Sequence, residues 1–367
     1  MRRVLQVITP SHVSGAEIQL VRLIRQLKAR GHTVTTLVKR NHSIVAELRR
    51  LGLDLEPLPI NGKLNLTSLP ILARRARQAR AELCHSHLSS ASWWCGWLQQ
   101  MGGPPSIGHV HGFTSALWHR HQSHLLAVSQ AVKDHLVNQG VPAERITVAH
   151  NALDPGDFIP TRSVDAVRGE LGADAATPVV GTFAHLSVKK GFRELFEAIP
   201  DVLSDCPRAQ FWIAGRGPLR EELETTARVR GFLANVRFLG FRTDMADLIQ
   251  AIDVLALPSH REPCALVFVE SALLAKPILA CRSGGAPESI ADGQTGLLVP
   301  VGDSRQIASQ LLLLLTNREQ ARKMGLAGRQ RALDLFGWNR FLRTLEATYE
   351  RVLDERIAGT ANPRRAA

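Results

Sequence analysis

Residues 2–39 read RRVLQVITPSHVSGAEIQLVRLIRQLKARGHTVTTLVK and contain the pattern that repeats through the chain. A short apolar run is followed by a polar loop, an amphipathic segment over residues 16–30, and a β-branched run that begins after Gly31. Helices and strands bury their apolar residues with different periods, so these signals predict a strand, a helix and a second strand. The stretch therefore predicts one βαβ unit.

Similar units recur in the second half of the chain. The predicted strands there are TPVVGTFAHL, AQFWIAG, NVRFLGF, DVLALPS and KPILACRS. Strands that alternate with helices predict parallel sheets covered on both faces. With 367 residues, which exceeds the usual size of one core, the chain is expected to be an α/β protein with two doubly wound domains.

The segment DPGDFIPTRS clusters proline, glycine and aspartate where the periodicity lapses. It predicts a first domain over residues 1–160 and a second over residues 161–337. From about residue 302 the chain is predicted to be almost wholly helical, with a last helix over residues 338–357. Open α/β sheets bind ligands at the carboxyl ends of their strands, so a cleft between two such domains is the expected site.

Composition narrows the class of protein. The chain is 45% apolar and 21% charged, which is typical of a folded globular protein. No apolar run suits a membrane span or a signal peptide, so we expect a cytoplasmic protein. Five cysteines without paired CxxC spacing favour neither a disulfide framework nor a zinc site.

The formal net charge of +12 is concentrated in the first half. Residues 1–160 carry 18 basic and 9 acidic side chains, a net +9. Such a domain attracts an anionic partner, for which nucleic acid, a phosphorylated substrate and the cytoplasmic membrane face are the alternatives. No sequence signature of a nucleic-acid-binding module accompanies the charge, so no nucleic-acid partner is expected.

Several glycine and lysine positions lie where a predicted strand gives way to a helix. Gly15 precedes the first helix, whose free N–H groups suit an anion. Lys190 lies in the loop before a helix that begins near Gly191, an arrangement suited to a diphosphate. Gly215 and Gly217 follow the AQFWIA strand and leave room for a flat group such as a base.

The stretch PSHREPCALVFVESALLA, residues 258–275, has two glutamates eight positions apart. Glu262 is predicted in the loop beyond a strand and Glu270 about one turn into a helix, so both can face one pocket. The helix N–H groups of Leu266 and Val267 would meet a phosphate. Carboxylates accept hydrogen bonds from sugar hydroxyls and stabilise positive charge on a sugar ring.

Histidines form two HxH pairs, His85 with His87 and His109 with His111, and a third group over residues 119–124. Alternate residues of a strand share a face, so each pair can present both rings to one cleft. A metal site is an alternative, but no third ligand set is evident, and we expect no metal.

The order of these motifs resembles that of the retaining glycosyltransferases of family 4, which have the GT-B architecture of two Rossmann-like domains. The resemblance runs from Val4 to about Tyr349. It rests on SGAE at 14–17, VHG at 110–112, AVSQAV at 127–132, AHNALD at 149–154, KKG at 189–191, AGRGP at 214–218, NVRFLG at 235–240, EPCALVFVE at 262–270 and SGGAPE at 283–288.

The resemblance implies a role for each candidate residue. Glu270 would hold the donor ribose, Lys190 the diphosphate and Glu262 the transferred sugar. His111 would lie beside the reacting sugar, and Gly15 would let the donor phosphate approach the first domain. The implied reaction is transfer with retention, without metal or cofactor, from a nucleotide sugar that is expected to be a UDP-sugar rather than a GDP-sugar. The last helix would cross back onto the first domain.

Some positions depart from the family pattern. His185 stands where an arginine commonly assists the diphosphate, and it would be only partly charged at neutral pH. Cys264 and Ala265 replace a usual Phe-Gly pair, Ser14 replaces the first glycine of a Gly-Gly loop, and Ala152 replaces a glycine. None of these changes removes a candidate glutamate or Lys190, so we expect an active enzyme.

The acceptor is expected to bind the first domain. The segment ILARRARQARAEL and the tryptophans 93, 94, 97 and 118 combine basic and aromatic side chains, as a protein resting on an anionic membrane requires. A solvated basic helix with core tryptophans is the alternative. The expected activity is extension of a lipid-linked glycan or lipopolysaccharide, and the closest rivals are a sugar-nucleotide epimerase and a phosphorylase of the same architecture.

Overall fold

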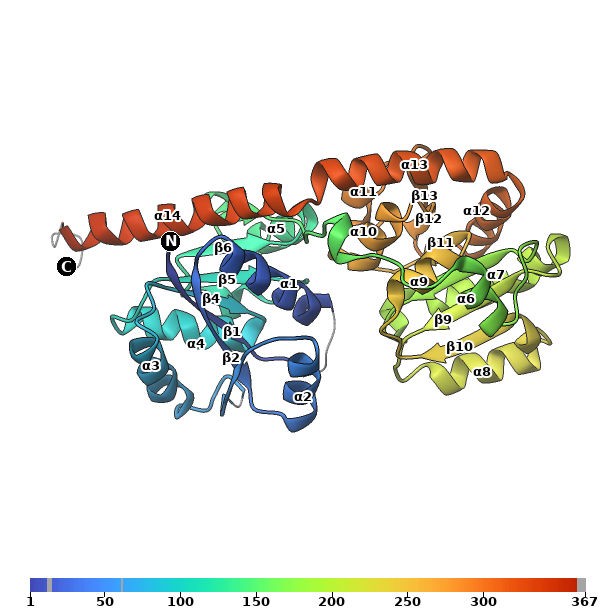
Figure 1. Cartoon of the computed structure of the whole chain (residues 1–367). Helices are drawn as coiled ribbons and strands as arrows, with labels where there is room; N and C mark the ends of the chain where they lie inside the picture. Colours follow the sequence, from blue (N-terminus) through green and yellow to red (C-terminus); the bar gives the residue numbers. More distant parts are fainter. Residues whose placement is uncertain (12–14, 61, 362–367) are drawn as a thin grey trace. The chain divides into compact units, whose positions relative to one another are not determined.

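A computed structural model describes residues 1–11, 15–60 and 62–361 of the chain. The chain forms two compact units (Figure 1). Unit 1 combines Met1–Ala152 with the segment from Trp338 onward, and unit 2 spans Leu153–Gly337. The first unit thus ends before the DPGDFIPTRS segment, about eight residues earlier than the sequence pattern suggested. Among the helices of the described ranges, none has the length and apolar character needed to span a bilayer.

Unit 1 is built on a parallel sheet with strand order β3-β2-β1-β4-β5-β6-β7. The strands are β1 (Arg3–Ile8), β2 (Thr33–Lys39), β3 (Glu56–Leu58), β4 (Leu83–His87), β5 (Ser106–Val110), β6 (His124–Ala127) and β7 (Ile146–Val148). The helices are α1 (Gly15–Ala29), α2 (His42–Arg50), α3 (Ser68–Gln78), α4 (Ser89–Gln100), α5 (Gln130–Val137) and α14 (Trp338–Ala361), with the 3-10 turns η1 (Ala116–His119) and η2 (Ala143–Arg145).

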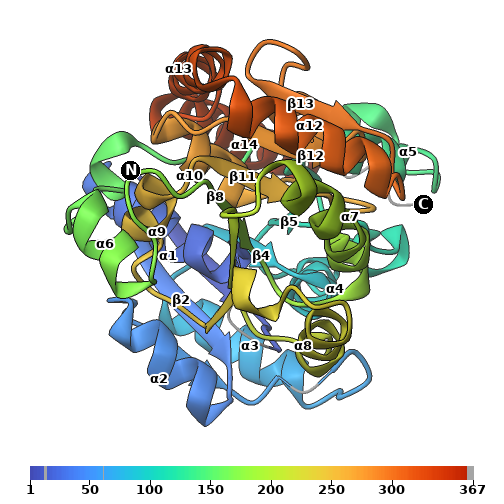
Figure 2. The same cartoon turned by 90° about the vertical axis from the view of Figure 1, so that its right-hand side faces the viewer.

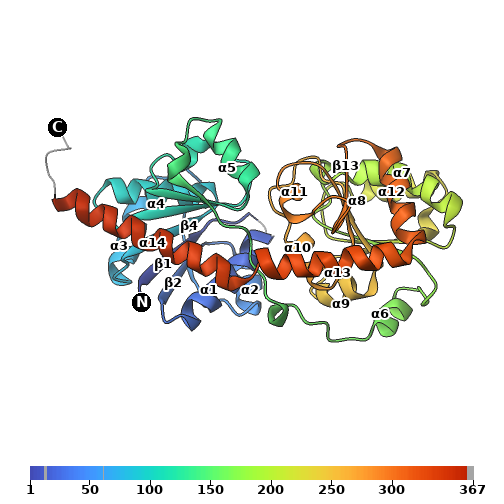
Figure 3. The same ribbon diagram turned by 90° about the horizontal axis from the view of Figure 1, so that it is seen from above.

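Helices cover both faces of this sheet because alternate strand residues point to opposite sides. Val4 packs with residues of α1 and α14, whereas its neighbour Leu5 packs with residues of α3 and α4. Helix α14 buries a stripe at helical spacing that includes Phe341, Leu345 and Tyr349. Figure 3 shows α14 lying along unit 1. The C-terminal helix therefore completes the core of the unit that contains the N-terminus.

Unit 2 has a second parallel sheet, of order β10-β9-β8-β11-β12-β13. Its strands are β8 (Val179–Phe183), β9 (Gln210–Ala214), β10 (Val236–Gly240), β11 (Val254–Leu257), β12 (Ile278–Cys281) and β13 (Gly296–Val299). Its helices are α6 (Val164–Glu170), α7 (Phe192–Asp205), α8 (Arg220–Val229), α9 (Met245–Ala251), α10 (Leu266–Leu273), α11 (Ala286–Ser289), α12 (Ser304–Thr316) and α13 (Arg318–Leu335), with η3 (Pro155–Asp157), η4 (Val188–Lys190) and η5 (Leu233–Asn235).

Two apolar layers enclose the sheet of unit 2. Residues of α7, α8 and α12 pack on one face, and residues of α6, α9 and α10 pack on the other; α13 contributes residues to both layers. Figure 2 shows α7 beside α12, which pack against each other. The predicted α/β class with two doubly wound parallel sheets is confirmed. Helix α7 begins at Phe192, directly after Gly191, near which the sequence predicts a helix start.

Candidate functional site

The sheet of unit 2 changes direction between β8 and β11. The chain runs outward from β8 through β9 to β10 and then returns to place β11 on the other side of β8. Loops that leave the carboxyl ends of such neighbouring strands diverge and open a crevice for ligands. The loops after β8 and β11 therefore define the first candidate site.

An ion pair between a half-buried lysine and a buried glutamate joins these two loops. Nζ of Lys190 donates to Oε2 of Glu262 at 2.6 Å, and Oγ of Ser259 donates to the same oxygen at 3.1 Å. The Glu262 side chain is only 4% exposed and that of Lys190 19%. A carboxylate removed from water requires such partners, because an unpaired buried charge costs several kcal/mol. The structure thus brings together two residues that the sequence placed in separate motifs.

Glycines allow the surrounding loops to approach this closely. Gly191 has a φ of 72°, and a Cβ there would lie 1.9 Å from the carbonyl oxygen of Pro258. At Gly284, with a φ of 53°, a Cβ would lie 2.1 Å from the carbonyl oxygen of Glu262. The next residue, Gly285, donates its N–H to that same oxygen at 2.7 Å. The loops after β8, β11 and β12 therefore meet backbone to backbone around Glu262.

Helix α10 follows the Glu262 loop directly. Leu266 and Val267 form its first turn, and Glu270 lies within it with 8% of its surface exposed. The sequence predicts this arrangement of a loop glutamate and a helical glutamate. The ligand groups assigned to these residues stay predictions.

The loops after β8 and β9 contain the remaining candidates of unit 2. A Cβ at Gly215 would lie 1.9 Å from the carbonyl oxygen of Ala184, and one at Gly217 would lie 2.3 Å from that of Leu186. These glycines are thus required by the packing of two loops, and the base-binding role that we predicted for them stays a prediction. His185 lies exposed in the loop after β8.

In unit 1, Gly15 is the first residue of α1, directly after the predicted phosphate loop. Residues 12–14 of that loop, including Ser14, lie outside the described residues. His111 follows β5 and is half-buried. Strands β1 and β4 are neighbours although β2 and β3 lie between them in sequence, so this sheet also changes direction at its centre.

The two HxH pairs gather into one cluster on the sheet of unit 1. His85 and His87 lie 4.4 Å apart between ring centroids, and His109 and His111 lie 4.3 Å apart. Nδ1 of His87 contacts Nε2 of His111 at 2.9 Å. The third group lies elsewhere: among its members, His124 contacts Thr147 and Arg351, and His121 packs on Trp97.

Burial lowers the pKa of every ring in the cluster. Desolvation is the largest cause for His85, His87 and His109, and the neighbouring rings lower their pKa values further. For His111, desolvation lowers the pKa from 6.5 to about 4. At neutral pH the four rings are therefore uncharged and can accept as well as donate hydrogen bonds.

Two residues that contact the histidine cluster, Gln6 and Tyr349, were not among the candidates predicted from the sequence. Gln6 is a polar residue among the buried apolar residues of β1, and Oε1 of Gln6 contacts Nε2 of His87 at 2.8 Å. Tyr349 contacts Nδ1 of His85 through its hydroxyl at 2.7 Å. Gln6 could have been identified from the sequence, because a polar residue in a central strand is unusual. Tyr349 could not, because its position in the helix has the spacing of an ordinary core residue.

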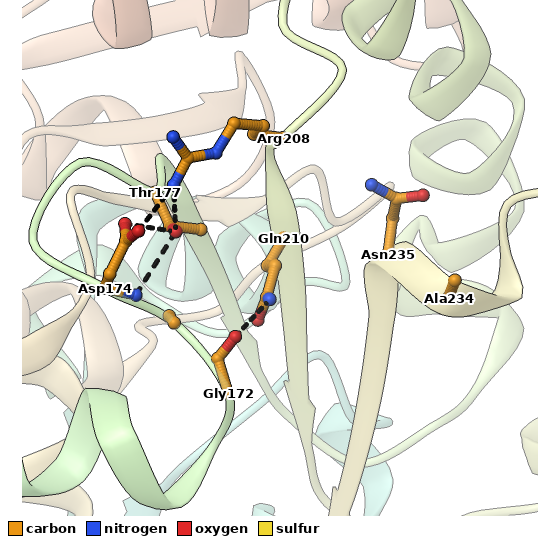
Figure 4. A pocket seen from close by; sticks show the side chains of 8 residues that line it. Gly172, Asp174, Thr177, Arg208, Gln210, Ala234 and Asn235 are labelled. Carbon is orange, nitrogen blue, oxygen red and sulfur yellow. Dashed lines mark hydrogen bonds and ion pairs between the residues drawn. The ribbon is translucent and has the colours of Figure 1, made fainter.

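A pocket at the other edge of unit 2 has no part in this chemistry. It lies before β8, β9 and β10, at the amino ends of these strands, and Figure 4 shows its polar lining. Arg208 and Asp174 form an ion pair there at 2.6 Å, and both side chains are 62% exposed. Because parallel α/β sheets bind ligands at their carboxyl edge, we do not assign a ligand to this pocket.

Solved structures with the same architecture include two that match nearly the whole of this chain. The structure of HepE from Anabaena with UDP and glucose has a TM-score of 0.85 and 23% identity, and the match covers 96% of this chain and all of that one. Sucrose-phosphate synthase from Thermosynechococcus elongatus matches with a TM-score of 0.80 and 20% identity over 96% of this chain and all of its own. The fold is thus that of the GT-B glycosyltransferases.

A glycosyltransferase family model matches the sequence of each unit. A family model described as Glycosyltransferase Family 4 matches residues 13–157, and one described as Glycosyl transferases group 1 matches residues 177–317. The chain belongs to the family 4 glycosyltransferases.

Curated relatives include the lipopolysaccharide core biosynthesis glycosyltransferase LpsE of Rhizobium meliloti, which is 24% identical over 88% of this chain and 92% of its own. A second relative is the GDP-mannose-dependent monoacylated alpha-(1-6)-phosphatidylinositol monomannoside mannosyltransferase of Corynebacterium glutamicum, which is 28% identical over 74% of this chain and 70% of its own.

Replacing Gly284 tests the close approach of the loops around Glu262. Gly284→Ala introduces a Cβ against a backbone oxygen that cannot move freely, whereas Gly293→Ala has a similar φ of 73° and nothing within 4 Å. Both substitutions incur a left-handed backbone cost of about 1 kcal/mol. We expect Gly284→Ala to lower the free energy of unfolding in urea by at least about 2 kcal/mol more than Gly293→Ala. An equal loss of unfolding free energy in the two variants would contradict the close approach of Gly284 to the backbone of Glu262.

The buried histidines make the folded state sensitive to acid. Desolvation lowers the pKa of His119, like that of His111, from 6.5 to about 4. The stability they contribute is present above pH 6.5 and is lost as the pH falls toward 4, by about 2 kcal/mol per group near pH 5. We expect the free energy of unfolding to fall over this range and to fall less in His119→Leu. The exposed His42→Leu is the control, and an unfolding free energy that is constant between pH 8 and 5 would contradict the prediction.

Proposed function

We propose that the protein transfers a sugar, with retention and without a metal ion, from a UDP-sugar to a glycan or lipid-linked acceptor in cell-envelope polysaccharide or lipopolysaccharide synthesis. The observation that carries the proposal is the Lys190–Glu262 pair at the carboxyl edge of unit 2. A cation and a carboxylate held in one crevice match the two ends of a diphospho-sugar. Membership of family 4 supports this assignment.

Donor binding would exchange the partners within this pair. A diphosphate offers Lys190 a stronger anion than one carboxylate, and the N–H groups of Leu266 and Val267 at the start of α10 add the positive end of a helix dipole. Glu262, released from Lys190, then accepts hydrogen bonds from the sugar and faces the charge that develops on its ring. Glu270 binds the ribose hydroxyls, and the exposed His185 supplies a weaker diphosphate contact than an arginine would.

The nucleotide is proposed to be UDP. The structure of HepE contains UDP and glucose, whereas the mannosyltransferase of Corynebacterium glutamicum is named for GDP-mannose. Thermal-shift measurements with UDP, GDP and ADP and with their sugars decide between them. A larger shift with GDP or ADP than with UDP would overturn the assignment of the base without affecting that of the reaction.

Two glutamine variants separate the roles of the glutamates. Glu270→Gln removes an acceptor for the ribose, so UDP affinity should fall by about tenfold or more, because one charge-assisted hydrogen bond is worth about 1.5–3 kcal/mol. Glu262→Gln should leave UDP affinity within about threefold of the wild type and lower the rate of sugar transfer by about a hundredfold. Calorimetry measures the first effect and release of UDP the second.

The exposed Glu197→Gln on α7 is the matched control for both variants. Full UDP affinity in Glu270→Gln would contradict the ribose assignment, and a full transfer rate in Glu262→Gln would contradict the role at the sugar.

A lipid-linked acceptor places unit 1 against a membrane, and its surface suits this contact. Leu64 and Leu66 are 92% and 78% exposed. Lys63 lies 3.4 Å from the ring centroid of Trp118, and the helix α3 that follows carries exposed Arg74 and Arg77. Exposed leucines beside basic residues can insert into an anionic lipid surface. One of the four tryptophans that the sequence placed on this surface, Trp94, is a core residue with 2% of its surface exposed.

Flotation with liposomes tests the membrane contact. The protein should float with vesicles that contain phosphatidylglycerol and less so as salt is raised, because each basic residue near the surface contributes about 1 kcal/mol that salt screens. Leu64→Ser with Leu66→Ser should weaken flotation, whereas Leu326→Ser, also on an exposed leucine, should not. Absence of salt-sensitive binding would remove the membrane claim and leave the sugar transfer untouched.

A further inference from the structure

A line of hydrogen-bonding groups connects α14 to His111 within unit 1. The Tyr349 hydroxyl contacts Nδ1 of His85 at 2.7 Å, and Nε2 of Gln6 contacts the same nitrogen at 3.3 Å. Oε1 of Gln6 contacts Nε2 of His87 at 2.8 Å, and Nδ1 of His87 contacts Nε2 of His111 at 2.9 Å. Every member before His111 is at most 1% exposed.

The register of the sheet explains why these groups meet. Gln6 of β1 pairs with His85 of β4, and His87 of β4 pairs with His109 of β5. Paired residues and those two positions along a strand share one face of a parallel sheet. The face is the one on which α14 packs. A polar line thus crosses an otherwise apolar layer.

The direction of the hydrogen bonds follows from the uncharged state of the rings. Burial lowers the pKa values of His87 and His111, and a neutral imidazole has one N–H and one acceptor nitrogen. Nε2 of His87 faces the amide oxygen of Gln6, which can only accept, so this nitrogen holds the hydrogen. Nδ1 of His87 is then the acceptor, and Nε2 of His111 must donate to it.

We propose that Gln6 and His87 are positioning residues that hold His111 in the tautomer with hydrogen on Nε2, so that its Nδ1 accepts a hydrogen bond from a hydroxyl group. An unprotonated nitrogen repels phosphate and carboxylate oxygens and accepts from an O–H. The group that His111 meets is therefore a sugar hydroxyl rather than the diphosphate. This assignment of the ligand group rests on the proposed function, whereas the tautomer does not.

Metal binding is the competing explanation of the cluster. His85, His87 and His109 offer ring nitrogens within 4.8 Å of one another. Both nitrogens of His87 already have partners, however, so a metal ion would have to displace either Gln6 or His111. The group also includes no carboxylate to offset the charge of a buried divalent ion. The hydrogen bonds to Gln6 and His111 explain the position of His87 without displacing a partner and without burying an uncompensated charge.

Nuclear magnetic resonance of histidine-¹⁵N-labelled full-length protein tests the proposal directly. Long-range ¹H–¹⁵N correlations distinguish the two tautomers and the charged ring, and His111→Asn identifies the signals of His111. At neutral pH we expect hydrogen on Nε2 of His111 and none on its Nδ1. Hydrogen on Nδ1, or a charged His111, would overturn the proposal.

A matched pair of glutamine variants tests the role of Gln6. Gln6→Leu removes the acceptor that fixes His87, so His111 should become a mixture of tautomers. With water as the acceptor, kcat for hydrolysis of UDP-glucose to UDP and glucose should fall by about tenfold with little change in KM. Gln19→Leu replaces another buried glutamine, whose amide has no hydrogen-bond partner in the described structure, and should change neither the spectrum nor the rate.

An unchanged His111 tautomer in Gln6→Leu would overturn the positioning role. A protein with the expected tautomer that shows no thermal shift with UDP, GDP, ADP or their sugars would instead contradict the proposed function, so the two failures are distinguishable.

Discussion

The buried carboxylate of Glu262 is the constraint on which the crevice of unit 2 depends. Its side chain receives hydrogen bonds from Lys190 and Ser259, and its backbone oxygen receives one from Gly285. A single residue thus ties together the ends of three loops that leave neighbouring strands. Because the desolvated charge must be matched, the positions of Lys190 and the glycine turn are set before any ligand arrives.

Unit 1 satisfies a different constraint, which is the placement of polar groups inside an apolar layer. Gln6, His85 and His87 lie on a face whose other residues pack against α14. Buried polar groups are costly without partners, and each of these three has at least one. Such a line fixes the orientation of its members more strictly than apolar packing does, since hydrogen bonds are directional.

The sequence predicted the fold well because the signals that determine it are local. Helical and strand periodicity over short segments is enough to give alternating elements, and the start of α7 after Gly191 follows from a loop glycine with left-handed backbone. The unit boundary at Leu153 was less predictable, because it depends on which core the chain joins.

The site was predicted in part. Lys190 and Glu262 were each identified from their own motifs, but their pairing spans 72 positions and depends on strand order. Strand order cannot be read from periodicity. The contact between the Tyr349 hydroxyl and His85 was not predicted for the same reason, because the two residues are 264 positions apart in the sequence. Gly215 and Gly217 show the opposite case, in which a conspicuous motif has a packing explanation that only the neighbouring backbone reveals.

The composition of unit 1 from two distant segments has a consequence during synthesis of the chain. The ribosome completes residues 1–152 and all of unit 2 before it makes α14, which supplies Trp338, Phe341 and Tyr349 to the core of unit 1. The first sheet to be translated is therefore the last to acquire its full core, whereas unit 2 is continuous in sequence and can fold as soon as it emerges. A nascent or truncated chain would hold its histidine cluster without its cover, so His111 would acquire its native surroundings only when translation is nearly finished.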